Sequence, residues 1–380
     1  MENSVNLVGF CMKSSLSPAR ILLKALCLFV VINILYAVID PQVDKISGYN
    51  FLFPGRTRLP FGINGDPYTV SVDDVDAMFA SHLISAAKKS NEYRVALIGD
   101  SSIWGEDLAA NEVISEQWNN LNIQCGNKTI RTYNLGYPHP SVFKDLVILD
   151  KVMGYQPDLI VWFVTLNTLI SQRTNPFLDA NHERVAKLLK TYDISFKQSK
   201  NFSDDKPGFY EKTLVGQRSN LARQIKLQML GFVWTATGAD INNLSADELP
   251  DLNVDDNPAY HGLQPTEDLT SLLSFDAITA GYEIADRVPI LVVNEPIFIS
   301  KGINSSVRYN SLYPRWAYDQ YRNTITTQAQ SAGWNYLDLW NVAPPEDFSD
   351  ASLHLNVPGE RTLVEQMIPV VRSLGCSQKP

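Results

Sequence analysis

The sequence predicts an α/β fold built around a central parallel sheet, and three observations support this. Short apolar runs alternate with segments that carry apolar residues at helical spacing, which is typical of strands joined by helices. The 380 residues are 45% hydrophobic and 19% charged, which is ordinary for a folded protein with a sizeable core. Small and polar residues directly follow several of the apolar runs, at the sheet edge where active sites form.

The strands and helices of this sheet can be assigned in order along the chain. The run at 159–164 (LIVWFV) is the most apolar beyond the N-terminal segment, so we expect it at the centre of the sheet. Pro369 lies inside the last helical pattern and should kink that helix. Strands are predicted at 93–98, 130–135, 159–164, 290–293 and 336–339, and helices at 111–121, 142–153, 318–329 and 363–374.

An N-terminal segment, 21–40, is predicted to be a transmembrane anchor. Residues 21–39 form a 19-residue apolar run interrupted only by Lys24 and Asn33, about the length that crosses a bilayer. Basic residues precede the run and acidic residues follow it, so residues 1–20 should be cytoplasmic and the rest extracytoplasmic. A cleaved signal peptide is the alternative, because Leu35-Tyr36-Ala37 resembles a poor cleavage site.

Beyond the anchor, we expect a linker and packing segment at 41–90 and one α/β domain at 91–375. The third and fourth strands are separated by about 120 residues, far more than one crossover needs. We interpret 170–285 as an insertion, with a helical stretch at 221–230 and a polar, turn-rich middle. It could form a cap near the site, or equally a surface elaboration without a catalytic role.

Charge, cysteines and histidines exclude several function classes. A net charge of −9 with no cluster of Lys and Arg argues against nucleic-acid binding. No two of the five histidines share a ligand spacing, and the four cysteines form no CxxC pair, so we expect no metal and no cofactor. Cys125 and Cys376 are the only thiols beyond the anchor and could pair in an oxidising compartment.

A serine and a histidine are candidates for nucleophilic catalysis. Gly99-Asp100-Ser101-Ser102 directly follows the first strand, where backbone N–H groups and a helix N-terminus would stabilise an anionic oxygen. His354 follows the last strand, at the same edge of the sheet, and Asp350 four residues earlier could orient its imidazole. Each residue also has a plain reading as a turn, surface or capping residue.

Two further residues would supply donors to a developing oxyanion. Gly136 follows the second strand and Asn167 the third, and a backbone N–H and a side-chain amide suit this role. Alone, Gly136 would be read as a turn glycine and Asn167 as a strand-end cap. Together with Ser101 and the Asp350–His354 pair, they place polar groups at the ends of successive strands.

On these residues the chain resembles the SGNH (GDSL-type) hydrolase family over roughly 90–170 and 285–375. The resemblance implies a three-layer flavodoxin-like fold, Ser101 as nucleophile and His354 as base. It also implies an oxyanion hole formed by the Ser101 N–H, the Gly136 N–H and the Asn167 amide.

Two departures from the family pattern leave the acid open. Thr165-Leu-Asn167-Thr168 stands where the family has Gly-x-Asn-Asp, and Asp350 is four residues before His354 instead of three. Asp347, Glu346 or a dyad without an acid are alternatives to Asp350.

The sequence therefore predicts a membrane-anchored serine esterase or O-acyltransferase. The anchor and the His-Leu-Asn-x-x-Gly ending are similar to those of exported members that modify envelope or secreted polysaccharides. Expected partners are an ester or acylated carbohydrate, the membrane and a membrane acyl-donor protein. His139 is a candidate substrate contact, with a structural loop histidine as the alternative. A non-catalytic envelope protein that binds such a partner is the rival function.

Overall fold

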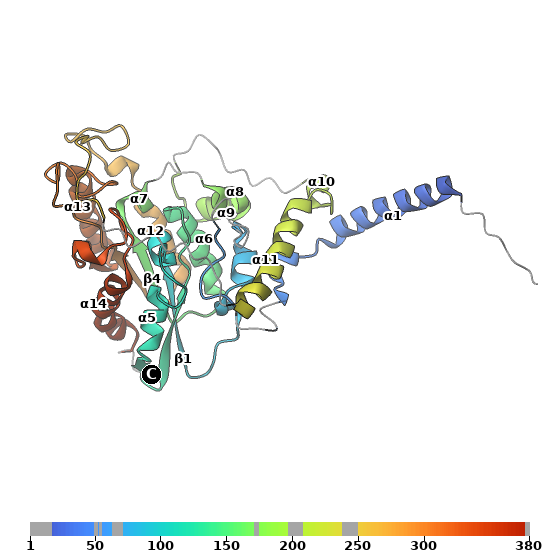
Figure 1. The fold of residues 1–380 in the computed structure, drawn as a ribbon, viewed down its shortest axis with the longest axis horizontal. Coiled ribbons are helices and arrows are strands. Elements are labelled where there is room, and N and C mark those ends of the chain that lie inside the picture. The colour runs from blue at the N-terminus through green and yellow to red at the C-terminus, as the bar shows by residue number, and fades with distance from the viewer. Residues whose placement is uncertain are drawn as a thin grey trace, which may run out of the picture. The chain divides into compact units, whose positions relative to one another are not determined.

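The computed structural model describes residues 17–48, 52, 55–62, 71–170, 175–196, 208–237 and 250–376. The chain divides into two compact units, one of residues 1–42 with 206–222 and one of residues 43–205 with 223–380. The second unit contains every candidate catalytic residue. It also contains the sheet, of which β1 and β4 are labelled in Figure 1.

The second unit is built on a six-stranded sheet in the order β2-β3-β1-β4-β5-β6. The edge strand β2 is antiparallel to β3, and the other neighbours are parallel. Counted without β2, the parallel strands run 2-1-3-4-5, the flavodoxin-like order of doubly wound folds. The predicted α/β class and parallel sheet are therefore confirmed. The strands are β1 (Glu92–Ile98), β2 (Gln124–Cys125), β3 (Lys128–Asn134), β4 (Leu159–Val164), β5 (Ile290–Asn294) and β6 (Asn335–Asp338).

Helices cover both faces of the sheet and make this a three-layer fold. The prediction of β4 as the central strand is confirmed, because its six residues are all buried and it pairs with β1 and β5. Ile160, Trp162 and Val164 belong to a core shared with α6 (Val142–Met153), α12 (Phe275–Ala285) and α13 (Arg315–Ala332). The alternate residues of β4 belong to a second core with α5 (Ile114–Asn120) and α14 (Val357–Gly375).

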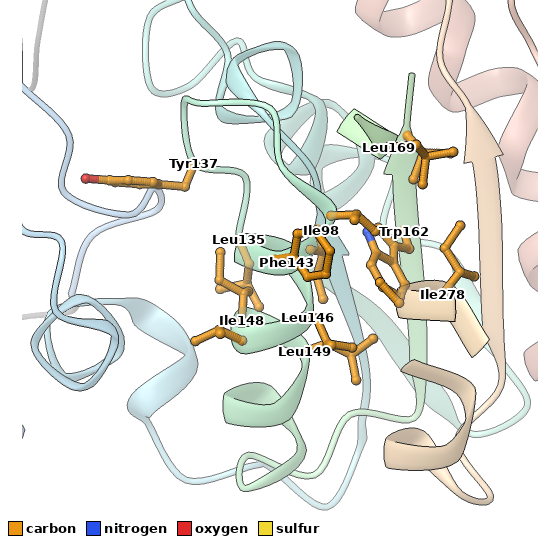
Figure 2. Packing of buried hydrophobic residues seen from close by; sticks show 14 of the residues in the cluster. Ile98, Leu135, Tyr137, Phe143, Leu146, Ile148, Leu149, Trp162, Leu169 and Ile278 are labelled. Carbon is orange, nitrogen blue, oxygen red and sulfur yellow. The ribbon is translucent and has the colours of Figure 1, made fainter. Parts of the chain in front are cut away.

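Trp162 shows how closely one helical layer packs on the sheet. Figure 2 shows its indole between Leu149 of α6 and Ile278 of α12. A Cβ added to Gly281 of α12 would lie 2.4 Å from the indole, so only glycine lets this helix approach. The indole N–H donates to Asp145 Oδ2 at 3.2 Å, which satisfies its one polar group.

The long connection between β4 and β5 is only in part the insertion that we expected at 170–285. Its last helix, α12, packs on α6 and shares the core of β4, so it belongs to the helical layer and not to an insertion. The remainder includes the stretch predicted at 221–230, which lies inside α11. The helices of the connection before α12 are α7 (Leu166–Leu169), α8 (Pro176–Ala180), α9 (His182–Thr191), α10 (Phe209–Lys212) and α11 (Arg218–Thr237).

Several smaller predictions differ from the structure. The two-residue strand β2 was not predicted, because two residues carry no periodic signal. Pro369 lies inside α14, which runs from Val357 to Gly375, and the kink expected at this residue stays a prediction. The remaining elements are α3 (Val75–Ala80), α4 (Ser101–Trp104) and the short 3₁₀ helices Val43–Lys45, Leu83–Ser85, Thr270–Leu272 and Pro345–Asp347.

A disulfide joins Cys125 to Cys376 and ties the end of α14 to β2.

The first unit contains α1 (Pro18–Ile39), the described helix that is long and apolar enough to cross a membrane. A signal sequence near an N-terminus would have the same properties. Its polar residue Asn33 is buried, with Oδ1 accepting the Val215 N–H at 3.0 Å and Nδ2 donating to Phe29 O at 2.9 Å. These bonds satisfy the amide, which would otherwise be costly in an apolar environment.

Candidate active site

Ser101 and His354 lie in hydrogen-bond contact at the carboxyl end of the sheet. Ser101 follows β1 directly and begins α4, whereas His354 lies in the loop between β6 and α14. Although 253 residues separate them, Ser101 Oγ is 2.8 Å from His354 Nε2. This is the reach that a general base needs to take the proton of a hydroxyl nucleophile.

Asp350 contacts the other ring nitrogen of the same histidine, with Oδ2 2.8 Å from Nδ1. Its Oδ1 accepts the backbone N–H groups of residues 352, 353 and 354, at 2.9–3.2 Å. This tight turn folds the loop back on itself, which explains how an acid four residues before the histidine can reach it. Among the described residues, neither Asp347 nor Glu346 bonds to the imidazole.

The contacts of this pair shift both pKa values. Burial raises the pKa of Asp350, but its hydrogen bonds to His354 and Ser352 and the histidine's charge outweigh burial and lower it to about 2. Burial lowers the pKa of His354, but the bond and charge of Asp350 and the charges of Glu106 and Asp100 raise it to about 9. The pair is therefore an ion pair near neutral pH.

A buried lysine holds together the two loops on either side of the serine. Lys144 of α6 donates through Nζ to Gly99 O at 2.7 Å and to Tyr137 O at 2.6 Å. It also pairs with Asp145 at 2.9 Å, and both side chains are fully buried. Removing either partner of such a pair would leave the other charge buried and uncompensated. The pair therefore keeps Lys144 in place, and its bonds to the two carbonyls hold the loops together.

Beneath Ser101 lies a second buried acid, Glu295, which directly follows β5. Ser102 Oγ is hydrogen-bonded to Glu295 Oε2 and to Asp100 Oδ1. Burial, followed by the charge of Asp100, raises the pKa of Glu295 well above its ordinary value. The bond between Glu295 and Ser102 supports the turn that carries Ser101.

The expected helix N-terminus contributes little to this site. The helix α4 is a single turn of four residues, too short for an appreciable macrodipole. Oxyanion stabilisation would therefore depend on individual donors. Among the described residues, the Ser101 N–H donates to no protein acceptor.

Gly136 packs tightly against α4, but its N–H is occupied. A Cβ at this position would lie 2.4 Å from Trp104 N and 2.7 Å from Ile103 C, so the glycine is required by the close approach of two backbones. The Gly136 N–H donates to Asn134 Oδ1 at 3.0 Å. Its role as an oxyanion donor stays a prediction, one that requires this bond to be shared or exchanged.

Asn167 presents one end of its amide to a partner from the long β4–β5 connection. It lies in α7, where Thr168 Oγ1 accepts the Thr165 N–H at 3.2 Å and so caps the helix. Asn167 Oδ1 accepts the hydroxyl of Tyr260 at 2.7 Å. Among the described residues no acceptor is bonded to Nδ2, which leaves it as a donor for a ligand.

His139 lies two residues beyond Tyr137 and carries a strained backbone, with φ of +82°. Its ring is half-buried and 5.8 Å from that of Phe61. Burial, assisted by the charge of Lys144, lowers its pKa, so it is neutral at pH 7. No contact with Ser101 or His354 connects it to the catalytic pair, and its substrate role stays a prediction.

Four residues of this region were not predicted from the sequence: Glu106, Lys144, Tyr260 and Glu295. Glu295 carries a signal similar to that of Asn167, because it directly follows β5 and Asn167 comes three residues after the end of β4. The other three take their roles from tertiary contacts and have no local signal.

Other parts of the described chain include further cavities but no metal-binding cluster. No group of three or more His, Cys, Asp or Glu side chains among the described residues is arranged to hold a metal ion. A cavity of about 710 Å³ lies where β1 and β3 begin, at the end of the sheet away from Ser101. Two of its charged residues, Arg94 and Glu92, are paired at 2.7 Å.

Comparisons with known proteins give distant structural likenesses. No protein-family model matches the chain, and no curated protein matches it by sequence. Among solved structures, a carbohydrate acetylesterase family member from Sinorhizobium meliloti is 14% identical, with 74% of this chain and 98% of that one covered and a TM-score of 0.34. A lipase/acylhydrolase from Enterococcus faecalis is 13% identical, with 76% and 99% covered and a TM-score of 0.35.

A third likeness is to a member of the lipolytic protein G-D-S-L family from Veillonella parvula. It is 9% identical, with 73% of this chain and 97% of that one covered and a TM-score of 0.35. At such TM-scores these likenesses decide neither the fold nor the activity.

Proposed function

We propose that this chain is a serine esterase or O-acyltransferase that acts on O-acyl esters through a Ser101 acyl-enzyme. One observation carries the proposal: the continuous chain of contacts from Ser101 Oγ through the imidazole of His354 to Asp350, at 2.8 Å for each bond. A hydroxyl, a base and an orienting acid in this order are the requirements of acyl transfer by nucleophilic catalysis.

In this mechanism His354 acts in its neutral form. Nε2 takes the proton of Ser101 as Oγ forms a bond to the ester carbonyl carbon, and the imidazolium then gives that proton to the leaving alcohol as its C–O bond breaks. The Ser101 N–H and the Asn167 amide donate to the oxyanion, together with the Gly136 N–H once its bond to Asn134 is shared or exchanged. Water or a sugar hydroxyl then releases the acyl group by the same steps in reverse.

The location favours extracytoplasmic esters. The apolar helix α1 supports a membrane anchor, and the Cys125–Cys376 disulfide is typical of an oxidising compartment. We infer an acylated carbohydrate of the cell envelope as the substrate class, with a membrane acyl donor if the acyl group passes to a sugar. Transfer would then require that the site exclude water from the acyl-enzyme.

Active-site labelling of the full chain tests the proposal. A fluorophosphonate probe should label the wild type and a Ser331→Ala control, whose serine is exposed on α13, and should fail to label Ser101→Ala. Turnover of p-nitrophenyl acetate should fall by about a thousandfold or more in Ser101→Ala. Addition of oligosaccharide acceptors then separates transfer from hydrolysis. Labelling that persists in Ser101→Ala would contradict the proposal.

One observation favours the rival function, a non-catalytic envelope protein that binds a partner of polysaccharide modification. The Gly136 N–H, a donor that the reaction would use, is bonded to Asn134. Folded wild-type protein that takes up no probe and turns over no ester, yet binds acylated oligosaccharide, would support this alternative.

A further inference from the structure

A second carboxylate, Glu106, lies beside the catalytic histidine on the side of the nucleophile. Its Oε2 is 3.5 Å from His354 Nε2, the same nitrogen that bonds Ser101 Oγ. The Glu106 side chain is 39% exposed and that of His354 15%, so the pair is partly shielded from solvent. A charge at this distance and burial acts on the imidazole more strongly than a fully exposed one.

The backbone turn after α4 fixes the position of Glu106. The N–H groups of Gly105 and Glu106 both donate to Ser101 O, at 3.0 and 3.1 Å. Gly105 and Asp107, on either side, have φ of +85° and +68°, which turn the chain back toward the serine. The backbone of Glu106 is therefore bonded to the carbonyl of Ser101, the proposed nucleophile.

Asp107 joins this turn to the loop that carries the histidine. Its Oδ2 accepts the Ser349 hydroxyl at 3.0 Å, and the Ser349 N–H donates to His354 O at 2.9 Å. Because both loops are tied together, the backbone of Glu106 is held beside the loop that carries His354.

The charged groups that face His354 are all acids. Asp350 lies on its own loop, Glu106 on the turn after α4, and Asp100 at the start of that helix. Glu360 of α14 also faces it, and burial raises the pKa of this acid well above its ordinary value. Removing one anion should therefore make the imidazolium less stable.

We propose that Glu106 is a positioning residue that stabilises the His354 imidazolium from the Nε2 side. The inference rests on the proposed function, in which His354 takes the Ser101 proton. When Nε2 is protonated, its N–H points toward Ser101 Oγ, the leaving oxygen and Glu106. The carboxylate holds the proton-bearing ring in place until the leaving alcohol takes the proton. Glu106 thus favours attack by Ser101, but it also keeps His354 of the free enzyme protonated up to a higher pH.

Glu106→Gln, which keeps the size of the side chain and removes its charge, tests this proposal. The pH midpoint of kcat/KM for p-nitrophenyl acetate should move down by about half to one pH unit, because a neutral His354 becomes easier to form. The alkaline plateau should fall by about three- to tenfold, because the imidazolium formed during attack loses a partner. Glu106→Asp should restore part of both quantities.

Glu365→Gln is the matched control, since Glu365 is exposed on α14 and contacts neither loop. It should leave midpoint and plateau unchanged. A loss of rate in Glu106→Gln without a shift of the midpoint would indicate a structural role only and would overturn the proposal. NMR titration of the His354 ring in Ser101→Ala, with and without Glu106→Gln, measures the same shift without any turnover.

Failure of this inference can be distinguished from failure of the proposed function. If Ser101→Ala and His354→Ala keep full activity, the proposed function is wrong. If both abolish activity while Glu106→Gln has the pH midpoint of the wild type, only the role of Glu106 is wrong.

Discussion

The hydroxyl of Tyr260 donates to Asn167 Oδ1 at 2.7 Å and so determines which end of the amide is available to a ligand. Tyr260 belongs to the long connection between β4 and β5, and it is buried. This connection therefore reaches the candidate oxyanion donor Asn167. Without the tyrosine hydroxyl the amide could rotate and present its oxygen to an oxyanion.

Tyr260→Phe should therefore lower kcat more than it changes KM. We expect a loss of about tenfold in kcat for p-nitrophenyl acetate, since one oxyanion donor is misoriented part of the time. Tyr282→Phe is a suitable control, because that hydroxyl bonds Ile290 O on the sheet, away from Ser101. Equal losses in the two variants would show that packing, and not the amide, explains the effect.

Asp350→Asn should keep the loop but remove the charge that orients His354. An asparagine Oδ1 can still accept the three N–H groups of the turn, whereas its Nδ2 would favour the wrong tautomer of the imidazole. We expect kcat to fall by about a thousandfold or more. Asp347→Asn, which changes a nearby acid without contact to the ring, should retain most activity. The reverse ranking would identify Asp347 as the acid.

The pH dependence of the reaction follows from the raised pKa of His354, about 9. Only neutral His354 can take the Ser101 proton, and at pH 7 it makes up about 1% of the free enzyme. Between pH 6 and 8, kcat/KM should therefore rise by about tenfold per unit and level off near 9. Rates corrected for spontaneous ester hydrolysis would measure this. A plateau already reached at pH 7 would contradict the ion-pair description.

Gly136→Ala should displace the nucleophile as well as destabilise the fold. The new methyl group would meet backbone atoms of α4, which cannot rotate away, so the turn after Ser101 must shift. We expect a loss of about 1–3 kcal/mol in the free energy of unfolding and of more than a hundredfold in kcat/KM. Chemical denaturation and ester turnover measure the two effects.

Gly154→Ala, at the end of α6, is the matched glycine control. Its new Cβ would come no closer than 3.5 Å to Lys151 O, which is ordinary contact, and its φ is −64°. It should be nearly neutral in both measurements. A similar result for Gly136→Ala would mean that α4 tolerates the methyl group and is not held as closely as described.

Much of the sheet could be predicted because buried parallel strands are short and continuously apolar. The runs 93–98 and 159–164 coincide with β1 and β4 within one residue, and Gly154 ends α6 as its spacing indicates. The helix α12 was assigned to an insertion because a polar, turn-rich stretch precedes it. Its apolar face can be assigned to the helical layer only when α6 and Trp162 are known to lie against it.

The candidate site also has residues that the sequence predicts and residues that it does not. Ser101, Asn167 and His354 follow strands or the last strand's loop, so topology brings them to one edge whatever the details of the loops. The carboxylate of Glu106 reaches the histidine only through two left-handed residues and a bond between two loops. Such contacts have no fixed spacing along the chain, and a single sequence does not reveal them.

The Cys125–Cys376 bond joins two cysteines that are 251 positions apart in the chain. It therefore closes a covalent ring that includes the residues between them. Asn167, near the start of the long connection between β4 and β5, and His354, beyond its end, both lie within that ring. A single protease cut in this connection would leave both pieces on one molecule, which would migrate as an uncut chain on a gel until the bond is reduced. A nicked chain would thus keep its two pieces together where diffusion would otherwise separate them.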